Sequence, residues 1–415
     1  MNGPSGAGGG ICDLVIRRTH LFDGRAMLSG LHDVGVSGSE IVAVSETPLC
    51  GRKEVDAHGG WLTPGLIDTH VHFFDFMAVT DPVSLEQFLE AKAPELLQRF
   101  LDKGVTAIKS VGDPTDAVLD LRSRIATGRL CGPRLHVTGC GLTGREGHPA
   151  STIFRSNSWF RARAAGEVES PQMMRDIIHH LADLKVDAIK LLSEGGCACS
   201  GGPRYVWANP VFPNAVELVR LPRAVLRAGV EAAHELGLRV TVHTVQQSAA
   251  IEALEAGADG LEHGVTVEPI TDPALVTMML ERKATYAPTL WIHGAVHPES
   301  IPNTKRMADA GVRIVLGSDS FCGRGSFGDN SIEEAELMEA AGLDPVSVLT
   351  AATSEAARHL EREDLGEIAP GKRADLVLFE RNPTDRIGNL RTLAMTVLNG
   401  EIVVDRSLDE IHRSR

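Results

Sequence analysis

The chain of 415 residues is too long for one small domain, although barrel folds of about 250 residues or more can form a single unit. Its 43% hydrophobic and 23% charged residues are typical of a packed protein and exclude a disordered or fibrous chain. The formal net charge of −14 argues against a nucleic-acid partner, which would need a basic face.

The first part of the chain predicts a tail and then part of a small β domain. Residues 1–10 are rich in glycine and read as a flexible tail. Residues 11–62 contain short alternating stretches, such as 13–16 and 41–44, separated by Gly, Ser and Asp turns. This pattern is typical of short strands, so we assign 11–62 to the N-terminal part of the β domain.

The pattern changes in residues 63–362, where short apolar runs alternate with longer stretches of helical period. Eight such alternations favour parallel strands closed into a barrel, with an active site at the carboxyl ends of the strands. The predicted strands are at about 64–72, 104–111, 134–140, 186–193, 239–244, 259–264, 284–290 and 313–319.

The β pattern returns in residues 363–415. Asn399-Gly400 between two apolar runs is a strong signal for a hairpin. The predicted fold class is therefore α/β, a (β/α)8 TIM-type barrel with a small β-sandwich domain built from both chain ends.

The clearest local motif is Asp68-Thr69-His70-Val71-His72, at the end of the first barrel strand. Side chains alternate along a strand, so His70 and His72 point the same way and could hold one divalent metal ion. A His-x-His pair also arises by chance, so its weight depends on the other strand ends.

Four later strands also end in residues that can bind metals: Lys190, His243, His263 and Asp319. Imidazoles and a carboxylate on one rim form a nitrogen and oxygen site suited to zinc. Taken alone, His243 or His263 could be a hydrogen-bonded core histidine, and Asp319 a helix cap or turn residue. Their joint placement favours the metal site.

Lys190 is unusual in this set because an ammonium group cannot bind a cation. Burial lowers the pKa of a lysine, and the neutral amine can add carbon dioxide to become a carbamate that bridges two metals. The alternative is a plain ion pair with a carboxylate on the rim. Lys109, on the second strand, is a weaker candidate for the same role.

These residues resemble the binuclear-metal amidohydrolase superfamily, in order and in strand position. The resemblance is strongest to Xaa-Pro dipeptidases and imidazolonepropionase-like proteins, and it covers nearly the whole chain. The stretches that carry it are WLTPGLIDTH from Trp61, Gly139 through His148, Ala287-Pro288-Thr289-Leu290, and GEIAPGKRADLVL from Gly366.

The resemblance implies two divalent metal ions, most simply Zn2+, and hydrolysis of an amide or peptide C–N bond by a metal-bridging hydroxide. His70, His72 and Asp319 would hold one ion, His243 and His263 the other, and a Lys190 carboxylated by CO2 would bridge them. Asp319 would transfer the proton to the leaving nitrogen. His148 would contact the substrate and help to stabilise the oxyanion.

The stretch 200–221 after the fourth strand departs from the family pattern. It is longer than usual and contains Tyr205 and Trp207, which could line a substrate pocket or hold the loop down. Because loops on this face set specificity, the substrate stays open between a dipeptide and an N-acyl amino acid. The roles of Cys197 and Cys199 also stay open, since their one-residue spacing does not match common zinc pairs.

Several other functions compete with this interpretation. A mononuclear-metal deaminase would lack the strand 4 lysine, and a cyclic amide or lactone hydrolase would differ only in substrate. Gly139-Cys140-Gly141-Leu142-Thr143-Gly144 matches a dinucleotide-binding pattern, but Gly147 and Pro149 block the helix that an oxidoreductase would need. A non-catalytic binding protein is disfavoured by the complete set of ligands. His293 and His297 follow the seventh strand one helical turn apart and could reach the mouth of the barrel, but packing or solvent exposure is favoured.

The remaining expectations concern location and partners. Seven cysteines with no repeated spacing suit reduced thiols in a cytoplasm. No run reaches the roughly 20 apolar residues of a membrane span, and the first residues lack the pattern of a secretory signal. We therefore expect a cytoplasmic protein with a small-molecule substrate and no membrane partner, and the resemblance also suggests a homo-oligomer.

Overall fold

The computed structural model describes residues 11–193, 206–209, 212–217 and 219–406. The predicted tail, Tyr205, Cys197 and Cys199 lie outside these residues, as does Trp207's side chain. The chain forms two compact units: unit 1 comprises Met1–Leu66, Leu101–Thr106 and Pro345–Arg415, and unit 2 comprises Ile67–Phe100 and Ala107–Asp344. The sequence predicts domain boundaries near residues 62 and 362, and these boundaries remain a prediction.

Unit 1 is built on a mixed sheet of eight strands, contributed by both ends of the chain. The order is β21-β20-β19-β5-β1-β2-β3, and β4 pairs with β1. The strands are β1 (Cys12–Leu21), β2 (His32–Ser37), β3 (Glu40–Ser45), β4 (Gly51–Asp56), β5 (Trp61–Pro64), β19 (Leu376–Phe379), β20 (Leu393–Leu398) and β21 (Glu401–Asp405).

The long strand β1 joins the two parts of the small β domain, which the sequence predicts as a β-sandwich. This strand of ten residues pairs with β2 and β4 at its start and with β5 at its end, so both halves belong to one hydrogen-bonded sheet. The register shifts after Ile16, and Arg18 has φ 53°, which marks a bulge where the strand can bend. Buried side chains of both halves, including Leu14 and Leu378, form one core. The predicted Asn399-Gly400 hairpin is present between β20 and β21.

Unit 2 contains strands close to all eight predicted barrel positions. They form one sheet in the order β10-β9-β11-β14-β15-β16-β17 and another in the order β18-β6-β7-β8. The strands are β6 (Leu66–His72), β7 (Val105–Ser110), β8 (Arg134–Val137), β9 (Gly141–Gly144), β10 (Ala165–Val168), β11 (Ala188–Leu192), β14 (Arg239–His243), β15 (Gly260–Glu262), β16 (Thr285–Ala287), β17 (Arg313–Ile314) and β18 (Ser320–Phe321).

In the described residues, the strands of the predicted barrel form two parallel sheets rather than one closed sheet. The third and eighth predicted strands are each broken in two, into β8 and β9 and into β17 and β18. Hydrogen bonds still join the sheets on both sides. Thr69 N–H donates to Leu316 C=O (2.9 Å), and Asp187 N–H donates to Val137 C=O (2.7 Å).

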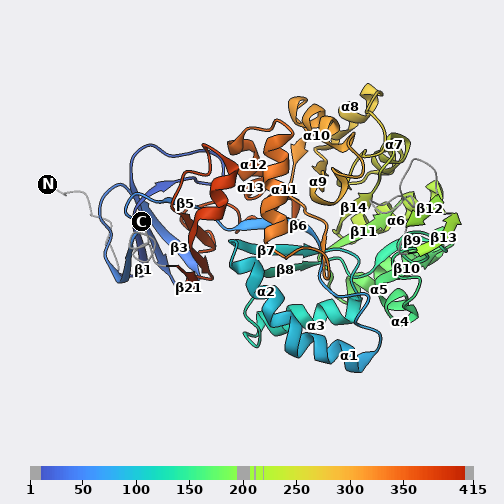
Figure 1. Cartoon of the computed structure of the whole chain (residues 1–415), viewed down its shortest axis with the longest axis horizontal. Coiled ribbons are helices and arrows are strands. Elements are labelled where there is room, and N and C mark those ends of the chain that lie inside the picture. The colour runs from blue at the N-terminus through green and yellow to red at the C-terminus, as the bar shows by residue number, and fades with distance from the viewer. Residues whose placement is uncertain (1–10, 194–205, 210–211, 218, 407–415) are drawn as a thin grey trace. The chain divides into compact units, whose positions relative to one another are not determined.

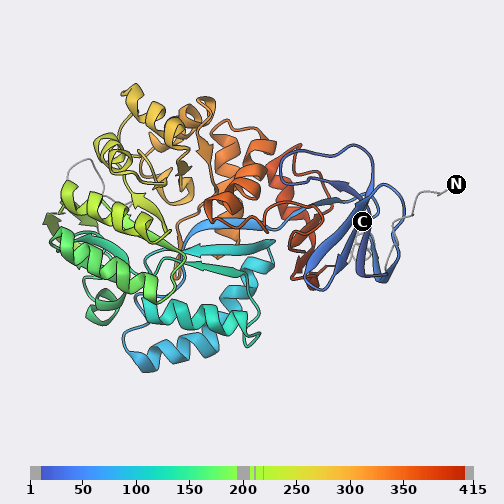
Figure 2. The same ribbon diagram turned by 180° about the vertical axis from the view of Figure 1, so that it is seen from behind.

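Helices surround the strands of unit 2 on the outside in both views (Figure 1 and Figure 2). Helix α5 buries Met174, Ile178 and Leu181 on one face, as expected of an amphipathic helix. The helices of the unit are α1 (Pro82–Gln87), η1 (Phe88–Lys92), α2 (Ala93–Leu101), α3 (Thr115–Ala126), α4 (Ser158–Ala164), α5 (Pro171–Asp183), α6 (Arg223–Glu235), α7 (Gln247–Ala256), α8 (Pro273–Arg282), α9 (Leu290–His293), α10 (Ser300–Asp309) and α11 (Asp329–Ala340).

The remaining elements lie outside these sheets and helices. Strands β12 (Val206–Asn209) and β13 (Phe212–Glu217) form an antiparallel pair within the long predicted loop. Unit 1 also has α12 (Pro345–Ala351), α13 (Ser354–His359) and the 3-10 helix η2 (Ile387–Thr392). None of the helices described is long and apolar enough to cross a membrane.

Gly264 lies two residues after the end of β15, and replacing it tests how tightly the chain is packed at this end of the strand. Its φ is +69°, and a Cβ atom there would lie 2.0 Å from the buried ring of Tyr286. Gly237 has φ +72° but no atom within 4 Å of such a Cβ. We expect Gly237→Ala to cost about 1–2 kcal/mol of unfolding free energy from backbone strain alone. Gly264→Ala should cost about 1–3 kcal/mol more, because the ring must move.

Urea denaturation of the two variants and the wild type measures this difference. Equal losses for Gly264→Ala and Gly237→Ala would show that Tyr286 does not constrain the chain at this point.

Candidate metal centre

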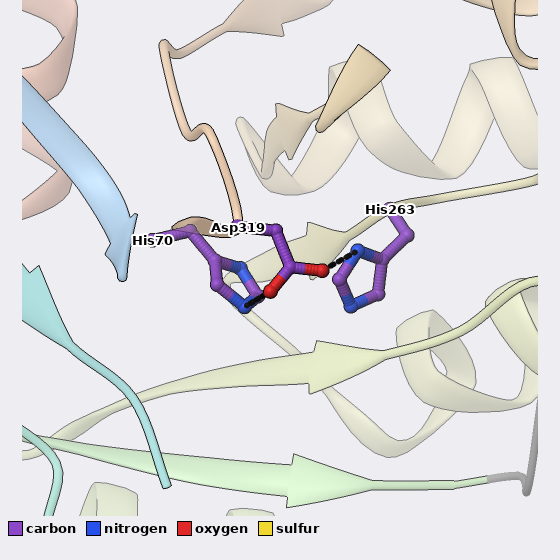
Figure 3. A group of neighbouring side chains, drawn as sticks. All are labelled: His70, His263 and Asp319. Carbon is purple, nitrogen blue, oxygen red and sulfur yellow. Dashed lines mark ion pairs between the residues drawn. The ribbon is translucent and has the colours of Figure 1, made fainter. Parts of the chain in front are cut away.

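Three side chains converge at the carboxyl ends of the strands of unit 2 (Figure 3). His70 lies on β6, and His263 and Asp319 lie just after β15 and just before β18. Ligand atoms of the three residues all lie within 4.8 Å of one another. Asp319 Oδ1 lies 3.5 Å from His70 Nε2, and Asp319 Oδ2 lies 3.7 Å from His263 Nδ1. Two imidazoles and a carboxylate at this spacing can bind one divalent cation.

His72 lies at the open side of this cluster. Its Nε2 lies 3.1 Å from Asp319 Oδ1, so the predicted His-x-His pair does share one carboxylate. The side chain of His72 is 33% exposed, whereas those of His70 and His263 are 1% and 4% exposed. Solvent therefore reaches the centre past His72.

Glu262, the last residue of β15, is a buried carboxylate that the sequence analysis missed. Its Oε2 lies 2.7 Å from His70 Nδ1, and its Oε1 accepts a hydrogen bond from Lys109 Nζ at 2.8 Å. Burial raises the pKa of Glu262, but Lys109, Lys190 and His70 outweigh this and hold it well below its ordinary value. A carboxylate on Nδ1 favours the tautomer of His70 that leaves Nε2 free to bind a cation.

Lys109 and Lys190 are both buried but differ in their partners. Lys109 donates to Glu262 and also to Thr241 Oγ1 (3.2 Å), so it is the charge partner of Glu262 rather than a second candidate for carboxylation. Lys190 Nζ has no hydrogen-bond partner within the described part of the chain. The plain ion pair considered for Lys190 is not formed there.

The environment of Lys190 lowers the pKa of its amine to about 8. Burial is the main cause, the carboxylate of Glu262 opposes it, and the positive charge of Lys109 adds to it. A pKa near 8 leaves an appreciable neutral fraction near physiological pH, as carbamate formation requires.

His243 lies beside His263, and His148 lies beside His243. The ring centroid of His243 is 4.5 Å from that of His263 and 5.1 Å from that of His148. His148 Nδ1 lies 2.8 Å from Thr152 Oγ1, and burial lowers the pKa of His148 to about 3. His148 is therefore neutral at neutral pH and can offer one ring nitrogen to a substrate.

His293 also belongs to this group, although the sequence analysis interpreted it as packing or surface. Its ring centroid is 4.8 Å from that of His263, and the residue is buried. Its Nδ1 lacks a hydrogen-bond partner among the described residues, and burial lowers its pKa to about 3. His297 stacks on His293 at 5.6 Å. The signal that could have revealed His293 was its place one short helix after β16.

Left-handed backbone conformations near the strand ends set the directions of the His263 and Asp319 side chains. Glu262 and His263 are consecutive, so a regular strand would place them on opposite faces. His263 instead has φ 66°, and Asp319 has φ 53°. Thr289, whose Oγ1 lies 2.8 Å from His263 Nδ1, has φ 48°, which is rare for a β-branched residue. Strain of this kind persists where surrounding contacts fix it, often at functional sites.

Asp68 ties β6 to the segment that carries Asp319. Its carboxylate accepts hydrogen bonds from the N–H of His70 (3.1 Å) and the N–H of Ser318 (3.0 Å). It also accepts from the hydroxyls of Ser318 and Ser331 at 2.6 and 2.7 Å. Asp68 is fully buried, and this burial raises its pKa. It therefore serves as a support for its neighbours rather than as a ligand.

The dinucleotide-binding interpretation fails on geometry. Gly141 and Gly144 lie in β9, and the next described helix, α4, begins at Ser158. A helix N-terminus that could hold a pyrophosphate is thus missing from this part of the described chain.

The donor set fits divalent cations. Neutral imidazoles and ionised carboxylates are the forms that bind metals. Burial, with the charge of Lys190, lowers the pKa of His70 to about 4, and burial and the neighbouring His243 hold the pKa of His263 well below its usual value. Burial raises the pKa of Asp319, but His70 and His72 outweigh it and keep this pKa below its ordinary value.

The chain is similar to known proteins in sequence and in fold. A model described as "Amidohydrolase family" matches residues 61–403. The imidazolonepropionase of Salinispora arenicola (strain CNS-205) is 24% identical over 344 residues, which cover 82% of each chain. Adenine deaminase 2 of Rhizobium etli is 26% identical over 393 residues, covering 89% of this chain and 54% of the deaminase.

A crystal structure of a Xaa-Pro dipeptidase with bound methionine in the active site superposes with a TM-score of 0.77. It is 23% identical, and the match covers 94% of this chain and 99% of the dipeptidase. At this identity the likeness shows the fold, which is the TIM-type barrel of amidohydrolases.

Replacing Glu262 by glutamine tests whether its carboxylate orients His70 and stabilises the buried Lys109. The change removes the carboxylate that forms an ion pair with the buried Lys109, so we expect a loss of about 3–5 kcal/mol in unfolding free energy. Metal affinity should fall about 10- to 100-fold, because His70 loses the group that orients it. The measurements are chemical denaturation and metal titration of the metal-free protein.

Glu231→Gln is the matched control, because Glu231 pairs with Arg175 on the surface and is 50% exposed. It should change stability by less than about 1 kcal/mol. A Glu262→Gln variant as stable as this control would show that the carboxylate of Glu262 does not stabilise the buried Lys109.

Proposed function

Because the chain belongs to the amidohydrolase family, we propose that it hydrolyses an amide or peptide C–N bond in a small molecule such as a dipeptide or an N-acyl amino acid. Family membership already supports an enzyme that acts on C–N bonds. The observation that carries the finer proposal is Lys190, a buried amine without a described hydrogen-bond partner, beside the cluster of His70, His263 and Asp319.

The proposed ligands of a first cation are His70, His72 and Asp319, and those of a second are His243 and His263. Lys190, once carboxylated, would supply an oxygen to each. Two bound cations, most simply zinc, would lower the pKa of a water molecule and polarise the scissile carbonyl. Carboxylation would turn an amine that cannot bind metals into a negatively charged oxygen ligand.

Electrostatics support this change of charge at Lys190. In the described structure both buried lysines face the carboxylate of Glu262, and Lys109 already forms an ion pair with that carboxylate. A protonated Lys190 would remain an unpaired buried cation, which is costly. A carbamate would reverse its sign and pair it with bound cations.

Asp319 is the proposed proton carrier. Its carboxylate lies between His72 on one side and His263 on the other, and it is ionised at neutral pH. An ionised carboxylate in this position can accept a proton from the attacking water and pass it to the leaving nitrogen. His148, neutral and beside His243, is proposed to contact the oxygen of the substrate carbonyl.

Alanine at Asp319 or at His70 tests the metal-dependent mechanism. Each change removes a proposed ligand, and we expect turnover to fall by at least about a thousandfold if metal activation contributes several kcal/mol. Initial rates at saturating metal measure this loss. Either variant with turnover close to wild type would contradict the proposed ligand set.

Lys190→Ala tests the carboxylated lysine more specifically. We expect it to abolish activity and to lose bound metal, and a short carboxylic acid such as propionate should restore part of both by filling the space with a carboxylate. Activity that survives in this variant without any added acid would show that Lys190 does not bridge the cations.

The substrate class and the metal are tested together. Metal analysis of the purified protein should give two divalent ions per chain, and a screen of dipeptides, N-acyl amino acids, lactones and aryl amides should release a carboxylate product. Release of ammonia by a protein with one ion per chain would instead indicate a deaminase.

A further inference from the structure

A group of aromatic side chains lies beside the open edge of the metal centre. Strands β18 and β6 pair in parallel, and Phe321 is directly opposite His72. Paired residues on neighbouring strands point to the same face of a sheet. The ring of Phe321 therefore lies on the face of His72, the most exposed of the proposed ligands.

Phe321 belongs to a cluster with Phe76, Phe154 and Phe160, which we name the aromatic platform. The ring centroid of Phe76 lies 6.3 Å from that of Phe321, 6.0 Å from that of Phe154 and 6.4 Å from that of Phe160. Phe154 and Phe160 are buried, whereas Phe76 and Phe321 remain partly exposed. The platform thus has a packed base and an accessible apolar side.

Hydrogen bonds hold the segment that carries Phe76. The Asp113 carboxylate accepts from the N–H groups of Phe73 (2.9 Å) and Phe74 (3.2 Å) at its start. The side-chain amide of Asn157 donates to the carbonyls of Phe76 and Val79, both at 2.8 Å. The position of Phe76 is therefore fixed before any ligand binds, which lowers the entropy cost of binding.

The carboxylate closest in sequence to Phe76 belongs to Asp75, and it forms hydrogen bonds within its own turn. Asp75 accepts from the N–H groups of Met77 (2.9 Å) and Ala78 (3.1 Å) within its own turn. Thr152, two residues before Phe154 in the chain, lies 2.8 Å from Nδ1 of His148 through its hydroxyl oxygen. The platform is therefore linked to the centre at two points: Phe321 is paired with His72, and the segment that carries Phe154 contacts His148.

We propose that the aromatic platform is an apolar subsite that binds a hydrophobic side group of the substrate, aromatic or branched aliphatic. This inference rests on the proposed function and names its substrate class. A group bound at the partly exposed rings of Phe76 and Phe321 lies next to the ligands that flank the scissile bond. Its burial there would favour substrates with large apolar groups over glycine-like ones.

Dipeptide kinetics test the proposal and show which side of the bond the platform serves. One series is Gly-Gly, Leu-Gly and Phe-Gly, and the other is Gly-Gly, Gly-Leu and Gly-Phe. In one of these two series, kcat/KM for the dipeptide that contains Phe should exceed that for Gly-Gly by at least about tenfold. This ratio should fall towards one in Phe321→Ala and in Phe76→Ala. The series that shows this preference identifies the side of the scissile bond that the platform binds.

Two further variants separate recognition from folding. Phe321→Leu keeps an apolar side chain and should retain most of the preference for the Leu dipeptide. Trp159→Ala, on the neighbouring helix α4, removes an aromatic ring that lies against Arg163 rather than in the platform. This control should keep the wild-type ratio, and an equal loss in it would overturn the proposal.

A binding experiment keeps this inference distinct from the proposed function. Calorimetry with the metal-loaded protein compares 3-phenylpropanoate with acetate, which share a carboxylate. We expect the phenyl compound to bind at least about tenfold more tightly to the wild type, and Phe321→Ala to lose this difference. If no dipeptide is cleaved but this preference holds, the proposed function fails and the subsite stands. If dipeptides are cleaved and neither experiment shows the preference, the subsite is refuted.

Discussion

The candidate metal centre depends on two contacts of the buried Glu262 carboxylate, one with His70 and one with Lys109. The carboxylate forms contacts of 2.7 Å with His70 and 2.8 Å with Lys109, and all three residues are buried. An isolated charge in such a place is costly, whereas a hydrogen-bonded pair is tolerated. This pairing fixes the ring of His70 and uses the charge of Lys109. Among the residues that the structure describes, Lys190 is consequently left as an amine without a hydrogen-bond partner, which is the group that the proposed chemistry requires.

The ends of the strands convert this buried network into a site. His243 and Glu262 are paired in register on β14 and β15, so their side chains share one face. Left-handed backbone at His263 and Asp319 then turns those two residues towards the same point. Regular strands fix most of the groups, and two strained residues complete the set. The partly exposed Phe321 is paired with His72, the most exposed of the proposed ligands.

Much of this arrangement could be predicted from the sequence. Alternating apolar runs and helical stretches predicted the parallel strands, and polar residues at their ends predicted that His70, His263 and Asp319 would meet. Glu262 was missed because it is adjacent to His263, and strand alternation places neighbours on opposite faces. Only the positive φ of His263 brings both into the site. The bulge in β1 and the breaks in the third and eighth strands depend equally on backbone angles, which hydrophobic patterns do not encode.

The central claim is that these strand ends hold a pair of cations bridged by a modified Lys190. A crystal structure with anomalous scattering data at the metal absorption edge tests it most directly. The account predicts two anomalous peaks, one near His70, His72 and Asp319 and the other near His243 and His263, with continuous density for a carbamate on Lys190 between them. A single peak, or two peaks beside an unmodified Lys190 amine, would contradict it.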